Sequence, residues 1–179
     1  PLAHLTMNSL VTVQETHDRF VRLATGGFVV ERHLYELART AHDFVDIAER
    51  LDGTPYLWGG RTRLGLDCSG LVQLAMETAG LPCPRDTDMQ AAEVGDRVTP
   101  TANFDNLERG DLVFWPGHVG IIIDGFMLLH ANGHHMSTVI EPLSQAISRI
   151  ARDAGDRGHI STIKRPPVRG RARQTIESN

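Results

Sequence analysis

A glycine-rich turn followed by a capped helix is the feature that most constrains this chain. The turn reads Pro55-Tyr56-Leu57-Trp58-Gly59-Gly60, and the helix begins at Asp67-Cys68-Ser69-Gly70-Leu71-Val72. Asp67 is a suitable N-cap, apolar residues recur at helical spacing as far as Ala79, and Gly80 and Pro82 supply a stop signal. The pattern predicts a helix over residues 68–79 that starts at a cysteine.

Cys68 at this position has two interpretations. Unpaired N–H groups and a partial positive charge of about half a unit at a helix N-terminus favour a thiolate and a developing oxyanion. The same periodicity places Cys68 on one stripe with Val72, Ala75 and Ala79, and free cysteine is among the most buried residue types. The helix alone leaves both interpretations open, because a catalytic cysteine also needs a base within reach.

A β-hairpin over residues 110–131 supplies candidate bases. Two apolar β-type runs are joined there at Asp124-Gly125. A three-residue loop over 123–125, with Gly125 in the left-handed conformation, pairs Ile122 with Phe126 and sets His118 directly opposite His130. Both imidazoles then project from one sheet face, and the order of helices before an antiparallel meander predicts that the helix N-terminus packs against that face.

A nucleophile, a base and a group that holds the tautomer of the base make a generalised catalytic triad. We therefore predict Cys68 as nucleophile, His118 as base and His130 as orienting residue. A zinc site that adds His134 and His135 to the two histidines is a competing hypothesis. Adjacent residues on a strand point in opposite directions, which disfavours that pair as joint ligands.

These motifs resemble the NlpC-type cell-wall peptidases over about residues 40–164, and further matches are Pro84-Arg85, Gln90, Gly110–Phe114, His118–Ile121 and His130-Ala131. The resemblance implies an α+β, papain-like fold with N-terminal helices packed on an antiparallel sheet. It implies a thiol endopeptidase that hydrolyses γ-D-glutamyl bonds to diaminopimelate or lysine in peptidoglycan peptides, during wall turnover or muropeptide recycling. It also implies the same triad, with no cofactor and no metal.

The resemblance further implies a substrate pocket. Tyr56, Asp67 and Ser69 match pocket positions, and Trp58, Arg85 and Thr87 are the other substrate-binding candidates. In members that process released peptides, an acidic residue beside the cysteine pairs with the free L-Ala amine. The chain departs from the family pattern at Asp86-Thr87, where a Thr-Ser type pair is expected, and at Cys83. A catalytically silent wall-binding module and a related thiol amidase or acyltransferase stay open as alternatives.

The first forty residues have a different sequence pattern, with short β-type runs separated by turn residues. They resemble the end of a bacterial SH3-like module. We expect a partial SH3-like segment at 1–37, the peptidase domain at 38–165 and a basic flexible tail at 166–179. About 37 residues are too few for such a barrel to fold alone, so the segment has lost strands or packs on the catalytic domain. Because residue 1 is proline, we expect the chain to begin inside a longer product or after processing.

The composition agrees with a soluble enzyme that has one hydrophobic core of ordinary size. The chain has 179 residues, 41% apolar content and a net charge of −4, without the apolar run of about 18 residues that a membrane span needs. Its two cysteines make a disulfide framework unexpected and leave Cys83 a free, buried thiol. Five basic residues against one acidic residue from position 164 onward could contact an anionic polymer, but we expect a solvated terminus and no nucleic-acid partner.

The expected partner is a peptidoglycan-derived peptide. We expect a cytoplasmic location, with an exported or periplasmic protein as the alternative. The sequence does not determine the oligomeric state.

Overall fold

The computed structural model describes residues 3–167 of the chain. They divide into two units between Thr40 and Ala41, and the domain boundary expected after residue 37 stays a prediction. The basic tail expected over 166–179 lies outside the described residues from position 168 on. No helix within residues 3–167 has the length and apolar character needed to cross a membrane.

The N-terminal unit contains a three-stranded antiparallel sheet. Its strands are β1 (Val13–His17), β2 (Phe20–Leu23) and β3 (Phe28–Val30), in that spatial order, followed by the short 3-10 helix η1 (Glu31–His33). Within residues 3–40, the only buried apolar side chains are Val21 and Leu23. The relation of this small sheet to an SH3-like module stays a prediction.

The second unit carries four α-helices, α1 (Phe44–Glu49), α2 (Cys68–Thr78), α3 (Thr87–Glu93) and α4 (Leu143–Ala154). The short 3-10 helix η2 (Gly155–Arg157) follows α4, and a small ribbon of β4 (Arg61–Thr62) and β5 (Gly65–Leu66) precedes α2. The predicted start of α2 is confirmed, because Asp67 accepts a 2.7 Å hydrogen bond from the backbone N–H of Gly70. Gly80, with φ +70°, takes the left-handed conformation after the helix.

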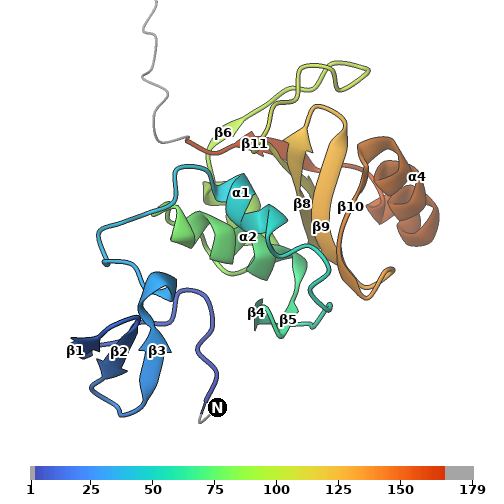
Figure 1. The fold of residues 1–179 in the computed structure, drawn as a ribbon. Helices are drawn as coiled ribbons and strands as arrows, with labels where there is room; N and C mark the ends of the chain where they lie inside the picture. The colour runs from blue at the N-terminus through green and yellow to red at the C-terminus, as the bar shows by residue number, and fades with distance from the viewer. Residues whose placement is uncertain (1–2, 168–179) are drawn as a thin grey trace, which may run out of the picture. The chain divides into compact units, whose positions relative to one another are not determined.

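A six-stranded antiparallel sheet forms the centre of this unit (Figure 1), in the order β10-β9-β8-β7-β11-β6. The strands are β6 (Asp96–Arg97), β7 (Leu112–Trp115), β8 (His118–Asp124), β9 (Met127–Asn132), β10 (Ser137–Pro142) and β11 (Thr162–Arg165). β7, β8 and β9 are almost wholly buried, which explains their nearly continuous apolar sequences.

The two faces of the sheet are covered by different helices. Leu143 and Ala146 of α4 share a buried cluster with Val113, Ile122 and Leu128. α2 lies beside β8 and β9, and the opposite face of these strands is also buried. Because side chains alternate along a strand, His118 and His130 project from the face that α4 covers. The expectation that α2 packs against the histidine face is therefore wrong.

The hairpin between β8 and β9 has a different register from the expected one. Ile122 pairs with Leu128 and Asp124 with Met127, so that Ile123 is a bulge. The Asp124 carboxylate accepts hydrogen bonds from the N–H groups of Phe126 and Met127, and Gly125 is not left-handed. The predicted Ile122–Phe126 pair and the directly opposed histidines are wrong. Before the bulge, each paired β8 residue has a β9 partner two positions later than expected. Because two is an even number, both histidines still share one face.

Candidate active site

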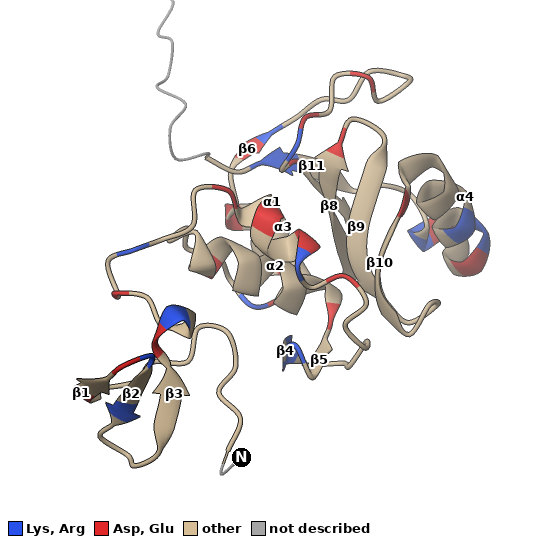
Figure 2. Ribbon diagram, viewed as in Figure 1, with Lys and Arg blue, Asp and Glu red and all other residues tan. Residues whose placement is uncertain are grey.

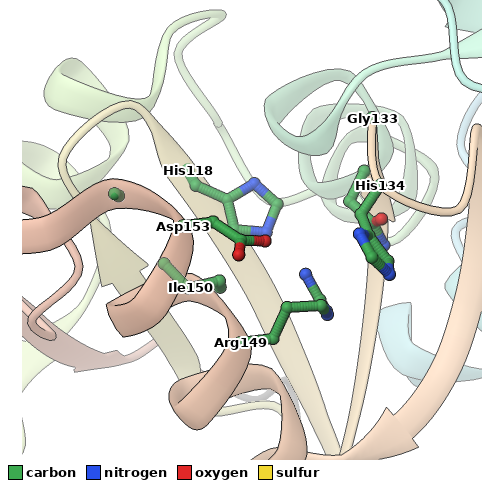
Figure 3. A pocket seen from close by; sticks show the side chains of 8 residues that line it. His118, Gly133, His134, Arg149, Ile150 and Asp153 are labelled. Atoms are coloured by element: carbon green, nitrogen blue, oxygen red, sulfur yellow. The ribbon is translucent and has the colours of Figure 1, made fainter.

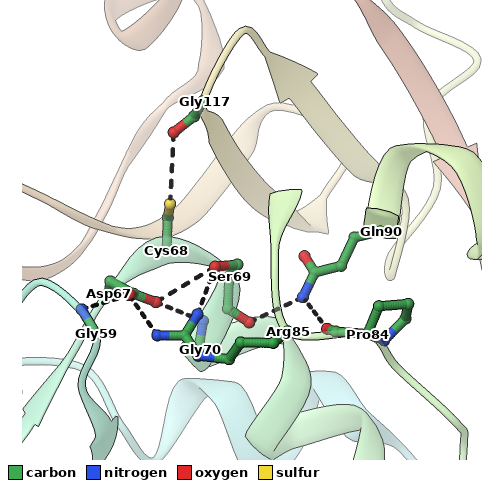
Figure 4. A network of polar contacts seen from close by, with 9 residues as sticks. All are labelled: Gly59, Asp67, Cys68, Ser69, Gly70, Pro84, Arg85, Gln90 and Gly117. Atoms are coloured by element: carbon green, nitrogen blue, oxygen red, sulfur yellow. Dashed lines mark hydrogen bonds and ion pairs between the residues drawn. The ribbon is translucent and has the colours of Figure 1, made fainter. Parts of the chain in front are cut away.

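The sulfur of Cys68 lies where β8 and β9 separate. Pairing between these strands ends at Ile121 and Leu129, which leaves the start of β8 without a neighbour on its β9 side. The Sγ atom of Cys68 lies 4.0 Å from the Gly117 carbonyl oxygen (Figure 4), and the Val119 N–H is also directed at it. The Cys68 sulfur therefore lies beside the backbone on each side of His118, although α2 and the His118 side chain lie on opposite faces of the sheet.

The glycines of the motif let α2 approach this point. A Cβ atom added to Gly70 would lie 2.3 Å from the Gly60 carbonyl oxygen, and one added to Gly60 would lie 2.4 Å from that of Gly65. The first turn of α2 thus packs directly against the backbone of the loop before it. Side chains at these positions would push the Cys68 end of the helix out of place.

A charged cluster fixes the same helix end from the other side. Asp67 accepts hydrogen bonds from the Gly59 N–H at 2.7 Å and from Arg85 at 2.5 Å, and Arg85 also donates to the Ser69 hydroxyl at 2.7 Å (Figure 4). Burial acts to raise the pKa of Asp67, but these hydrogen bonds, together with the one from Gly70, outweigh it and hold the pKa below its usual value. The three predicted pocket residues Asp67, Ser69 and Arg85 therefore form one ionised, hydrogen-bonded group.

A chain of hydrogen bonds runs from His118 across the sheet face to α4. His118 Nε2 lies 2.8 Å from His130 Nδ1, and His130 Nε2 lies 2.7 Å from Glu141 Oε1. Arg149 of α4 donates to the same carboxylate oxygen. Burial acts to raise the pKa of Glu141, but the contacts with His130 and Arg149 lower it overall. Glu141 is therefore an ionised acceptor.

This acceptor determines both histidine tautomers. Ionised Glu141 requires a proton on His130 Nε2, which leaves His130 Nδ1 as an acceptor. His118 must then carry its proton on Nε2, and its Nδ1 has a free lone pair. Among the described residues, that Nδ1 makes no hydrogen bond. In this tautomer the Nδ1 atom of His118 is chemically able to accept a proton.

Burial shifts the pKa values of His118, His130 and Cys68. Burial, with the neighbouring His130 and Arg149, lowers the pKa of His118 to about 3. Burial also lowers the pKa of His130, against the opposing effect of Glu141. Burial raises the pKa of the Cys68 thiol, although the Val119 and Ser69 N–H groups act in the other direction. Burial thus acts against the thiolate that the helix N-terminus is expected to favour, and Cys68 is only 7% exposed.

The remaining predicted residues lie at different places. Burial raises the pKa of Tyr56, and the charges of Cys68 and Asp67 act in the same direction, which places Tyr56 near Cys68. Trp58 is 84% exposed, and Thr87 begins α3. Within residues 3–167, no hydrogen bond or ring contact joins either of them to Cys68 or to the two histidines. Cys83 is a partly buried free thiol whose pKa is raised by burial to about 12.

Sequence reasoning missed Glu141 and Arg149. Strand alternation could have placed Glu141 on the face of its β9 neighbours, but no local motif indicates that Arg149 reaches it from a separate helix. The alternative zinc site has no counterpart in residues 3–167, where no group of three or more His, Cys, Asp or Glu side chains could hold a metal ion.

A buried cysteine at a helix start, a histidine with a free Nδ1 and a carboxylate-anchored second histidine are the residue types that a thiol-dependent catalytic site uses, and here they lie on an α+β scaffold. The model of the NlpC/P60 family matches residues 53–152. The chain belongs to the NlpC/P60 family, whose members are cysteine peptidases.

Similarity to known proteins supports this family assignment. The chain is 31% identical to a dipeptidyl-peptidase 6 of Lysinibacillus sphaericus over 68% of this chain and 47% of the relative. It is 33% identical to a γ-D-glutamyl-L-lysine dipeptidyl-peptidase of Bacillus subtilis, over 60% of this chain and 38% of that one. The crystal structure of an NlpC/P60 family protein from Bacillus cereus has a TM-score of 0.70 at 20% identity, covering 90% of this chain and 55% of that one. The chain thus spans less than half the length of these two relatives, and the structural similarity shows the shared fold.

Proposed function

We propose that this protein is a thiol endopeptidase that hydrolyses γ-D-glutamyl–diamino-acid bonds in peptides derived from bacterial peptidoglycan. The observation that carries the proposal is the continuous hydrogen-bond chain from His118 through His130 to Glu141, with the Cys68 sulfur held beside the backbone of His118. The name of the Bacillus subtilis relative, which specifies a γ-D-glutamyl-L-lysine bond, supports this bond class.

The proposed reaction begins with Cys68 as a neutral thiol. As Sγ attacks the γ-carbonyl carbon of D-glutamate, the thiol proton moves to Nδ1 of His118, and the carbonyl oxygen becomes an oxyanion near the N-terminus of α2. The imidazolium then gives this proton to the leaving amine of the diamino acid, and the C–N bond breaks. Water, deprotonated by His118, hydrolyses the resulting thioester and restores the thiol. An amine in place of water gives acyl transfer.

Glu141 and His130 act as positioning residues in this scheme. His118 carries a positive charge only after it accepts the proton, and the ionised Glu141 stabilises that charge through His130. The pKa of His118 is low in the resting protein, so the base stays unprotonated well below neutral pH. Charging the buried His118 imidazole costs free energy, and the nearby negative carboxylate of Glu141 offsets part of that cost.

The acyl side of the substrate is proposed to lie at Tyr56, Asp67, Ser69 and Arg85. We propose that the free amine of an L-Ala-γ-D-Glu peptide binds at Asp67, where it shares the carboxylate with Arg85. A blocked amine removes one charge-assisted hydrogen bond and leaves a bulky group against a nearly buried carboxylate. This preference favours released peptides, and with it a cytoplasmic recycling role, over intact wall.

The test compares free L-Ala-γ-D-Glu-meso-diaminopimelate, its N-acetylated form and intact sacculi, with products identified by mass. We expect release of diaminopimelate from the free peptide by the wild type and by Cys83→Ser, and none by Cys68→Ala. Equal loss in both cysteine variants would show a structural effect and contradict the proposal. Failure of iodoacetamide to label Cys68 in the folded protein would support a catalytically silent module. Comparable rates on sacculi would overturn the recycling role.

A further inference from the structure

A cavity of about 230 Å³ borders His118 on the face covered by α4. Its walls are His118, residues 132–134 at the end of β9 and just after it, and the α4 residues Arg149, Ile150, Asp153 and Ala154 (Figure 3). Asp67, Ser69 and Arg85, which form the proposed acyl side, do not line it. The cavity therefore meets the proposed reaction centre only through the histidine that gives a proton to the leaving amine.

Arg149 and Asp153 give this cavity two opposite charges. They stand four residues apart on α4, which places them one turn apart on one helix face. Figure 2 shows basic and acidic segments side by side on α4, and Figure 3 shows the Arg149 guanidinium pointing toward the space that His118 and His134 border. The hydrogen bond from Arg149 to Glu141 uses one of five guanidinium N–H donors, so further donors are available to a ligand.

Two further observations favour a polar ligand here. The Asp153 carboxylate has an exposed ion pair with Arg152, at 3.2 Å and 51% side-chain exposure, which a ligand cation can replace at little cost. Asn132, whose side-chain nitrogen has no hydrogen-bond partner within the described residues, is a further polar residue of the cavity lining.

We propose that this cavity is the leaving-group subsite and that it selects meso-diaminopimelate over L-lysine, an inference that rests on the proposed function. The side chain of meso-diaminopimelate ends in a carbon that carries both a carboxylate and an ammonium group, whereas lysine ends in an ammonium alone. Arg149 binds the carboxylate and Asp153 binds the ammonium. The complementary pair on one helix turn thus matches the zwitterionic end of the diamino acid.

The experiment measures kcat/KM on L-Ala-γ-D-Glu-meso-diaminopimelate, on the L-lysine analogue and on L-Ala-γ-D-Glu-p-nitroanilide, which lacks the diamino acid. We expect the wild type to prefer the diaminopimelate peptide by about tenfold or more, the factor that one charge-assisted hydrogen bond supplies. Arg149→Gln should bring the ratio near one, although it also slows all substrates through Glu141. Asp153→Asn should slow both peptides several-fold relative to the p-nitroanilide, which carries no ammonium group for Asp153 to bind.

Arg157→Gln is the matched control, because Arg157 is an exposed arginine just beyond α4 that does not line the cavity. Its ratio should equal that of the wild type. A wild-type ratio near one, or a ratio that Arg149→Gln leaves unchanged, overturns the subsite assignment while hydrolysis itself upholds the proposed function. No hydrolysis of any of the three substrates by the wild type refutes the proposed function instead.

Discussion

Removal of the Glu141 carboxylate is the sharpest test of the role proposed for the hydrogen-bond chain in catalysis. Glu141 Oε1 accepts from His130 Nε2 at 2.7 Å, and the His130 side chain is fully buried. A charge-assisted hydrogen bond in such a place contributes about 1.5–3 kcal/mol. If this contribution is expressed in the transition state, where His118 is charged, Glu141→Ala lowers kcat/KM by about 10- to 150-fold. The loss should fall on kcat rather than on KM, because Glu141 lies outside the proposed substrate contacts.

Glu141→Gln is the matched variant. Its amide oxygen can still accept from both His130 and Arg149, since the two donors share one oxygen in the native structure. The tautomers of both histidines are then retained and only the charge is lost, so we expect a decrease of several-fold. The assay is steady-state hydrolysis of L-Ala-γ-D-Glu-meso-diaminopimelate, with thermal unfolding recorded for each variant.

Three results would refute this reasoning. Glu141→Ala with activity within about twofold of the wild type would show that the carboxylate does not support the transition state. An equal loss in the Gln variant would show that charge, and not tautomer control, is the whole effect. A loss confined to KM would place Glu141 in substrate binding.

Other predictions address the nucleophile, its base and the packing of its helix. Because burial raises the pKa of Cys68, its alkylation by iodoacetamide should keep accelerating as pH rises through and above neutrality; a plateau reached below pH 7 would reveal a preformed thiolate–imidazolium pair. His118→Ala should be nearly as damaging as Cys68→Ala, with the double variant no worse, because residues that act as one unit are not additive in kinetics; full activity of His118→Ala would exclude it as the base. Gly70→Ala should destabilise the protein by about 1–3 kcal/mol in urea unfolding, since its Cβ would overlap the Gly60 carbonyl oxygen. Gly125→Ala, whose Cβ has no neighbour nearer than 3.8 Å, is the control, and equal losses in the two alanine variants would argue against the packing explanation.

Local patterns in the sequence were enough to predict much of the scaffold. The start of α2 at Cys68 follows from a capping aspartate and helical periodicity, which act within a few residues. The shared face of His118 and His130 follows from strand alternation and survives any even change of register. The resemblance to the NlpC-type peptidases rests on these same motifs, and the family match confirms it.

Only the tertiary structure decided how these pieces operate together. The bulge at Ile123 and the capping by Asp124 set the hairpin register, because turn geometry depends on competing side-chain and backbone hydrogen bonds. Burial by packed residues raises the pKa of the Cys68 thiol, against the backbone N–H groups of Val119 and Ser69, which lower it. Glu141 reaches His130 from the edge strand β10, and Arg149 reaches Glu141 from α4. Such contacts arise when separate elements pack together, so no pattern within one segment of the sequence contains them.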